Sequence, residues 1–194
     1  MDNFPVYSTA LFLHILGAIA FFIALAILYA CVLGVRRAQT VQQIKLWTGA
    51  AAPAIRLIFP IAGVVILVAG IYMVVAAWGD RAQWAGVALI AFLLLMIASA
   101  LLQGRRITML GRQVADQPDN TPVTGALWTQ AHDAVTWVGV NAAVAFAIGI
   151  VYLMTLKPDA LGSVIALLIA LIVGLAFGFL TQGRAAAAPA LARE

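Results

Sequence analysis

His14 is the one histidine of the long apolar run Ser8–Leu33. Lipid cannot satisfy an imidazole, so a histidine in such a run either hydrogen-bonds a neighbouring polar group or ligates a metal. The nearest residues on its helix face, Ala10, Gly17 and Ala18, are small enough to admit another helix or a flat porphyrin ring. Two interpretations stay open: a hydrogen-bonded structural anchor, and an axial ligand of haem b.

Three further polar or sulfur-bearing side chains are expected at the depth of His14. At about 1.5 Å of rise per residue, Tyr72, Met73 and Tyr152 fall roughly 6 to 9 Å below the same membrane surface. We predict that they form one layer with His14. Met73 is then the candidate opposite ligand of a haem iron at His14. The two tyrosines and a main-chain carbonyl are the candidate hydrogen-bond partners of the imidazole.

A second polar group is predicted near the opposite surface. Its members His132, Asp133 and Asn141 share a helix region with Gln130 and Trp137, and Arg56 lies at a similar height as the candidate ion-pair partner of Asp133. His132 lies on the order of 20 Å from His14 in height, too far to share one metal. Asn141 and Ser99 are candidates for hydrogen bonds between helices. We favour such bonds over a cavity for a headgroup or a quinone.

Composition places these residues in a membrane. Of the 194 residues 65% are hydrophobic and 9% are charged, whereas about a quarter of the residues in soluble domains are charged. Five apolar runs can each cross a hydrocarbon core of roughly 30 Å as a helix. We predict an all-α bundle of five transmembrane helices in a single domain over residues 1–182, with a disordered tail at 183–194. The predicted spans are about 9–33, 54–78, 82–103, 134–156 and 161–180.

The segments between the spans carry weaker signals. Val41, Ile44 and Trp47 recur every three residues, which favours a short helix on the membrane surface. Pro60 lies inside the second span and predicts a kink, because its ring clashes with the carbonyl of the residue four positions before it. The polar segment 114–124 is expected to be an exposed loop.

The distribution of Lys and Arg predicts the orientation. Cytoplasmic segments of membrane proteins carry an excess of these residues. One side would have nine: Arg36, Arg37, Lys45, Arg56, Arg105, Arg106, Arg112, Arg184 and Arg193. The other would have two: Arg81 and Lys157. We therefore expect the N-terminus outside and the C-terminus in the cytoplasm, and the same topology explains the basic charge without nucleic-acid binding.

Several chemistries have no candidate residues in this sequence. It contains no C-x-x-C, no Gly-rich phosphate loop, no Glu-x-x-His and no Gly-x-Ser-x-Gly with a partner base. The central turns of the spans carry no Asp, Glu, Lys or Arg, which argues against an ion-coupled transporter. The single cysteine, Cys31, is expected to be a small buried apolar residue.

The segment Leu13–Ile19, LHILGAI, resembles the LHxLxA helix with which several bacterial membrane families begin. They are the copper-resistance D-like proteins, the HemJ-like protoporphyrinogen oxidases and an uncharacterised family of predicted integral membrane proteins. The stretch Pro60–Gly70, PIAGVVILVAG, and the turn between Trp78 and Trp84 are most similar to the uncharacterised family. In the HemJ-like family the equivalent histidine is implicated in haem, and the resemblance carries that role to His14.

We therefore expect a non-catalytic integral membrane protein of a bacterial inner membrane, an accessory or structural subunit of a larger assembly. Its expected partners are the lipid bilayer and other membrane subunits. The alternative is a redox protein that binds haem b or a porphyrin through His14.

Overall fold

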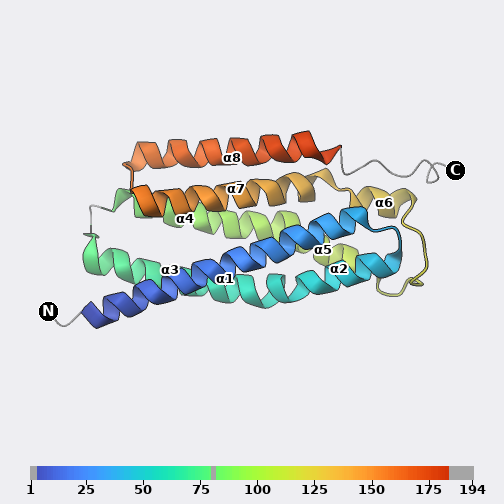
Figure 1. Ribbon diagram of the computed structural model, residues 1–194, viewed down its shortest axis with the longest axis horizontal. Helices are drawn as coiled ribbons and strands as arrows, with labels where there is room; N and C mark the ends of the chain where they lie inside the picture. The colour runs from blue at the N-terminus through green and yellow to red at the C-terminus, as the bar shows by residue number, and fades with distance from the viewer. Residues whose placement is uncertain (1–3, 80–81, 184–194) are drawn as a thin grey trace.

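The computed structural model describes residues 4–79 and 82–183. Within these ranges the chain is almost entirely helical, and five helices are long and apolar enough to cross a membrane. They lie roughly side by side along one axis (Figure 1), which confirms the predicted all-α multi-span bundle. These helices are Pro5–Arg37, Val41–Ala77, Gln83–Val114, Gly125–Leu156 and Ala160–Gln182.

Helix α1 (Phe4–Arg37) pairs with α3 (Phe59–Ala77) and crosses the bundle obliquely (Figure 1). Gly17 allows the close approach, since a Cβ there would lie 3.0 Å from Cγ1 of Ile66. Beyond Gly17, the ring of Phe21 meets Phe59 at 5.2 Å between ring centroids. From that point onward α1 supplies much of the core, including Ala24, Leu25, Leu28, Val32 and Val35.

The second membrane helix is longer than its predicted span. Helix α2 (Val41–Pro53) continues through a π-helical turn, η1 (Ala54–Ile58), into α3. The amide of Phe59 bonds the carbonyl of Ala54, five residues back, immediately before Pro60. Figure 1 shows the helix changing direction here, as expected where a proline and a π-turn interrupt the regular hydrogen bonds.

The third membrane helix also continues past residue 103, where its predicted span ends. Helix α4 (Gln83–Ser99) runs through a second π-turn, η3 (Ala100–Gly104), into α5 (Arg105–Val114). Ile107, Leu110 and Val114 of α5 are buried, and α5 packs against α2. The interpretation of α2 as a helix on the membrane surface is therefore wrong. Val41 and Ile44 of α2 are buried, and α2 packs on α1 and α5.

Helices α7 (Ala134–Leu156) and α8 (Ala160–Gln182) form the closest hairpin of the bundle, with the short helix α6 (Gly125–Ala131) preceding them. Gly174 and Gly178 of α8 lie against the backbone of α7. A Cβ at Gly174 would lie 2.7 Å from Cα of Ala142, and one at Gly178 would lie 2.8 Å from Cα of Val138. This Gly-x-x-x-Gly spacing lets two membrane helices approach closely.

The polar segment before α6 is exposed along much of its length but is tied to the junction of α1 and α2. The amide of Val123 donates to the carbonyl of Gln39 at 2.9 Å. Nζ of Lys45 lies 2.8 Å from Oδ1 of Asp119. These bonds fasten the segment between α5 and α6 to α2 and to the junction before it.

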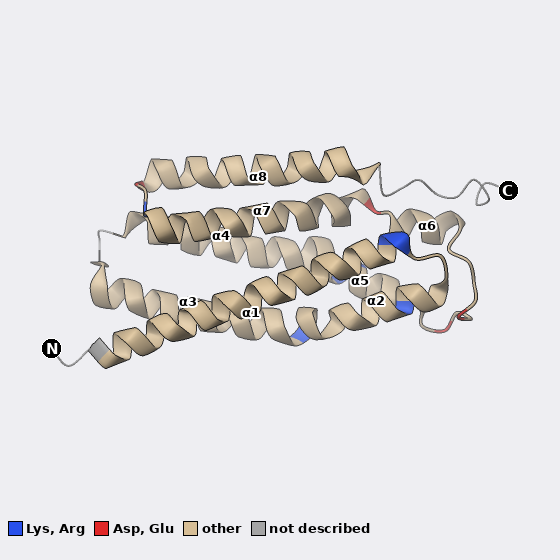
Figure 2. Cartoon of the chain, in the orientation of Figure 1, with Lys and Arg blue, Asp and Glu red and all other residues tan. Residues whose placement is uncertain are grey.

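In Figure 2 most of the Lys and Arg residues lie toward one end of the bundle. We call the end that carries Arg36, Arg105 and Arg106 the basic end. At the opposite end, Nζ of Lys157, in the α7–α8 turn, lies 4.2 Å from the centroid of the Trp78 ring. Asp80, Arg81 and the tail from Arg184 onward lie outside the described residues, as do the predictions made for them.

Candidate functional site

His14 of α1 is held by the main chain of α3. Its Nδ1 lies 2.9 Å from the carbonyl oxygen of Ile66. The ring lies against Gly70, where an added Cβ would come within 3.1 Å of Cε1 of His14. The absence of a side chain at Gly70 therefore gives the imidazole room beside the carbonyl one turn earlier on α3.

This hydrogen bond assigns the proton of the neutral imidazole. A carbonyl oxygen can only accept, so Nδ1 of His14 must donate to Ile66. Nε2 then carries the lone pair and is the atom able to ligate a metal or accept a further hydrogen bond. His14 is half-buried. The arrangement serves either of the two interpretations of His14.

The other members of the predicted layer have different surroundings. Tyr72 of α3 is 36% exposed and Tyr152 of α7 is 46% exposed. Met73 is half-buried. In the described structure the hydrogen-bond partner of His14 is a backbone carbonyl rather than either tyrosine hydroxyl. Their assignment to one cofactor layer remains a prediction.

The first half of α1, residues 5–20, has few neighbours within the chain. Gly17 is its only buried residue. Six of its large apolar side chains are each more than two-fifths exposed: Leu11, Phe12, Leu13, Ile15, Leu16 and Ile19. Because successive helical residues point to different sides, this segment is exposed around most of its circumference.

At the basic end, Asp133 forms the N-cap of α7. Its Oδ2 accepts from the amide of Thr136 at 3.0 Å and from the Thr136 hydroxyl at 2.6 Å. The same oxygen accepts from Nη1 of Arg106 at 2.9 Å. The sequence-based pairing of Asp133 with Arg56 is therefore replaced by one with Arg106. The unbroken helix α4–η3–α5 brings Arg106 to α7, while Arg56 is exposed in the π-turn of another helix.

Arg36, which the sequence indicated only as a topology signal, is 3% exposed. It donates from Nη1 to the carbonyl of His132 at 3.3 Å and from Nη2 to the carbonyl of Gln182 at 2.7 Å. These carbonyls lie at the C-terminal ends of α6 and α8, where a cation is favoured. The guanidinium carbon also lies 4.9 Å from the centroid of the Trp137 ring. Arg36 thus joins the ends of three helices.

The second polar group predicted from the sequence does not form one site, because its members make separate local contacts. His132 stacks on Trp128 at 4.1 Å between ring centroids and bonds the carbonyl of that residue through Nδ1 at 2.9 Å. Asn141 is buried and donates from Nδ2 to the carbonyl of Trp137 at 2.8 Å. Its Oδ1 accepts from the hydroxyl of Tyr29 at 3.3 Å, which joins α7 to α1. Ser99, the other candidate, makes no side-chain hydrogen bond among the described residues.

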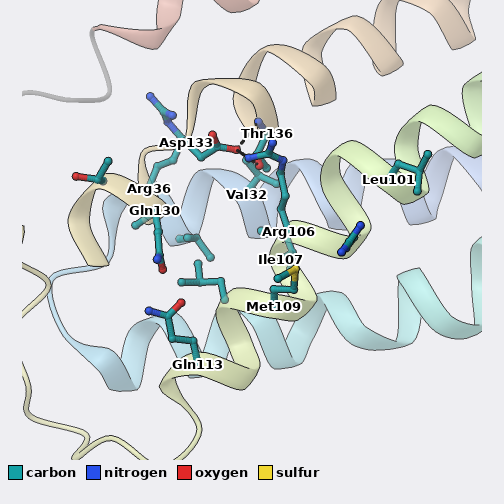
Figure 3. A pocket seen from close by; sticks show the side chains of 15 residues that line it. Val32, Arg36, Leu101, Arg106, Ile107, Met109, Gln113, Gln130, Asp133 and Thr136 are labelled. Carbon is teal, nitrogen blue, oxygen red and sulfur yellow. Dashed lines mark hydrogen bonds and ion pairs between the residues drawn. The ribbon is translucent and has the colours of Figure 1, made fainter. Parts of the chain in front are cut away.

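A cavity of about 510 Å³ opens between α1, η3, α5, α6 and α7 at the basic end (Figure 3). One part of its wall is polar or charged and the other is apolar. The polar lining is Arg36, Arg105, Arg106, Gln113, Thr129, Gln130, Asp133 and Thr136. The apolar lining is Val32, Val35, Leu101, Ile107, Met109, Leu110 and Ala131. Of the second polar group predicted from the sequence, Gln130 and Asp133 line this cavity, whereas His132, Trp137 and Asn141 do not.

Metal ligands are sparse in the parts of the chain that the structure describes. No group of three or more His, Cys, Asp or Glu side chains is placed to hold a metal ion among residues 4–79 and 82–183. Cys31 is buried in the core part of α1.

Comparison with known proteins finds no matching family model, no matching curated protein and no matching solved structure. The resemblance carried by the segment around His14 therefore stays a prediction.

Proposed function

We propose that this protein is a non-catalytic subunit, accessory or structural, of a larger assembly in a bacterial inner membrane. The observation that carries the proposal is the first half of α1. Its apolar side chains are exposed around the helix, whereas the second half of the same helix is packed into the core, with Leu25 and Leu28 only 2% and 1% exposed. A membrane helix that pairs with one neighbour over half its length has surface to offer another polypeptide.

The use of the polar side chains supports a structural role. Arg36, Asp133 and Asn141 each bond a group on a different helix. Bonds of this kind hold membrane helices together at about 1 kcal/mol each. Side chains already engaged in this way are less available to act on a substrate.

The excess of Lys and Arg at the basic end supports an orientation with that end in the cytoplasm. The first half of α1 would then lie in the outer leaflet. A partner subunit would reach it from the side, within the membrane.

Site-specific photo-crosslinking in intact cells tests this proposal. A photoreactive amino acid at Leu11, Ile15 or Ile19 is expected to give a discrete adduct with one other membrane polypeptide. The matched control positions are Ile165, Ile169 and Ile172, which are similarly exposed on α8 and are expected to give lipid adducts. Lipid adducts alone at the α1 positions would contradict the proposal.

Haem b binding through His14 is the second candidate, favoured by the free lone pair on Nε2. His14 and Met73 would be the residues that hold the haem iron. Gly17 packs against Ile66 of α3, so the small-residue face expected to admit a helix or a ring accepts a helix at this position. Bound haem would supply one-electron redox chemistry. A visible spectrum of protein purified from haem-replete cells tests it. A Soret band lost in His14→Ala supports this candidate, and a colourless stable preparation contradicts it.

A further inference from the structure

The cavity at the basic end combines charge with apolar surface. Arg36, Arg105 and Arg106 contribute three positive charges to its wall, and Asp133 contributes one negative charge. Oδ2 of Asp133 is already occupied by Arg106 and Thr136. The cavity therefore retains an excess of positive charge, which favours an anionic occupant.

Two of the arginines have donors to spare. Arg105 is exposed and forms no ion pair with any described acidic residue. Nε of Arg36 is buried and has no hydrogen-bond partner among the residues that the structure describes. A buried guanidinium N–H without a partner is costly, and the charge of Arg36 adds to the positive potential at the cavity wall. Arginine is well suited to phosphate, because its planar fork presents several N–H donors.

The apolar part of the cavity wall distinguishes an amphiphile from a small soluble anion. Leu101 and Met109 line the cavity and are also 57% and 54% exposed, so apolar surface runs from the cavity to the outside of the bundle. Figure 3 shows Leu101 and Met109 on the same continuous helix as Arg106. An acyl chain can follow this surface while its headgroup lies among the arginines.

The depth of the cavity also fits a lipid headgroup. From Gln83, where α4 begins, to Arg105 the helix rises about 33 Å, close to the thickness of a hydrocarbon core of roughly 30 Å. From Leu156 back to Asp133 along α7 the rise is about 35 Å. Both helices place the cavity at the boundary where phosphate groups lie. Its volume of about 510 Å³ falls within the usual range for ligand sites, roughly 300–1,000 Å³.

We propose that this cavity is a binding site for the phosphate-bearing headgroup of an anionic phospholipid. Arg105 donates to the phosphate oxygens beside the positive charges of Arg36 and Arg106, and Leu101, one turn deeper in the membrane than Arg105, contacts the start of an acyl chain. The proposal concerns a site remote from His14 and is independent of the proposed subunit function.

Native mass spectrometry of the full chain tests the site. The protein is reconstituted in phosphatidylcholine nanodiscs that contain phosphatidylglycerol, then released into mild detergent. We expect one retained phosphatidylglycerol on the wild type and a loss of about fivefold in the retained fraction for Arg105→Gln. The matched control is Arg112→Gln, an exposed arginine on α5 that does not line the cavity, which should retain the lipid. Circular dichroism checks that both variants remain folded.

Three outcomes would overturn the proposal. Retention of phosphatidylcholine equal to that of phosphatidylglycerol would exclude headgroup recognition. An equal loss in Arg105→Gln and Arg112→Gln would assign the effect to diffuse surface charge. Displacement of the lipid by inorganic phosphate at the same concentration would make a soluble phosphate the ligand instead.

Discussion

Nδ1 of His14 donates to the carbonyl oxygen of Ile66 across the α1–α3 pair, at 2.9 Å. The bond satisfies a polar nitrogen of the one histidine in the exposed half of α1. It also leaves Nε2 free, so the same geometry serves an anchor in the subunit proposal and a ligand in the haem alternative.

The contact between His14 and Gly70 predicts a strong coupling. Gly70→Ala should push the ring away from the Ile66 carbonyl and weaken a hydrogen bond worth about 1 kcal/mol. In a His14→Ala background the same change should be neutral or stabilising, because alanine is the better helix former by about 1 kcal/mol. Unfolding in mixed micelles measures the four free energies of the cycle. Gly86→Ala is the control, since a Cβ there meets nothing within 4 Å. Additive effects of the substitutions at residues 14 and 70 on the free energy of unfolding would contradict the contact between His14 and Gly70.

Arg36 is predicted to be a major determinant of stability. Arg36→Ala would leave two helix-end carbonyls without their donor and should cost about 3 kcal/mol in the free energy of unfolding. Arg36→Lys keeps the charge but should recover only part, because one ammonium does not reproduce the planar fork. Arg37→Ala, at an exposed neighbour, should change stability by less than about 0.5 kcal/mol. Equal effects at Arg36 and Arg37 would show that burial of Arg36 is unimportant.

The partner of Asp133 can be identified by a double-mutant cycle. Arg106→Gln and Asp133→Asn should show a coupling of up to about 1 kcal/mol that weakens with added salt, since Arg106 is partly exposed. The Arg56→Gln and Asp133→Asn pair should show none. Coupling to Arg56 in place of Arg106 would restore the pairing expected from the sequence.

The predicted orientation of the protein in the membrane, with the basic end in the cytoplasm, is tested by cysteine labelling in a Cys31→Ala background. A cysteine at Lys157 should react with a membrane-impermeant maleimide in intact cells. A cysteine at Asp116, in the exposed segment after α5, should react only after permeabilisation. The reverse pattern would mean that the count of basic residues gives the wrong topology.

The spans could be predicted from the sequence because hydrocarbon thickness fixes the length of an apolar run. The contacts at the basic end could not be predicted from the sequence, because they depend on which helices continue beyond the membrane. The apolar spacing of Ile107, Leu110 and Val114 indicates a helix, yet the predicted span ends at residue 103. Once α5 continues, Arg106 rather than Arg56 reaches Asp133.

Two further features depend on backbone positions that a single sequence does not provide. Arg36 resembles any basic residue at the end of a span until α6 and α8 bring their terminal carbonyls to it. The partner of His14 is a main-chain carbonyl, one of the expected alternatives, but no side-chain pattern indicates which carbonyl it is. The close contact of α7 and α8, by contrast, could have been predicted from the sequence, because Gly174 and Gly178 have Gly-x-x-x-Gly spacing.

The most direct test of the proposed function is native mass spectrometry of the untagged chain extracted from its own membrane with a copolymer, without detergent. The subunit proposal predicts that the 20.4 kDa chain is found with a second polypeptide at a fixed ratio. That polypeptide should be lost when Leu11, Ile15 and Ile19 are replaced together by alanine. A chain found alone, or only with lipids and copies of itself, would contradict the proposal.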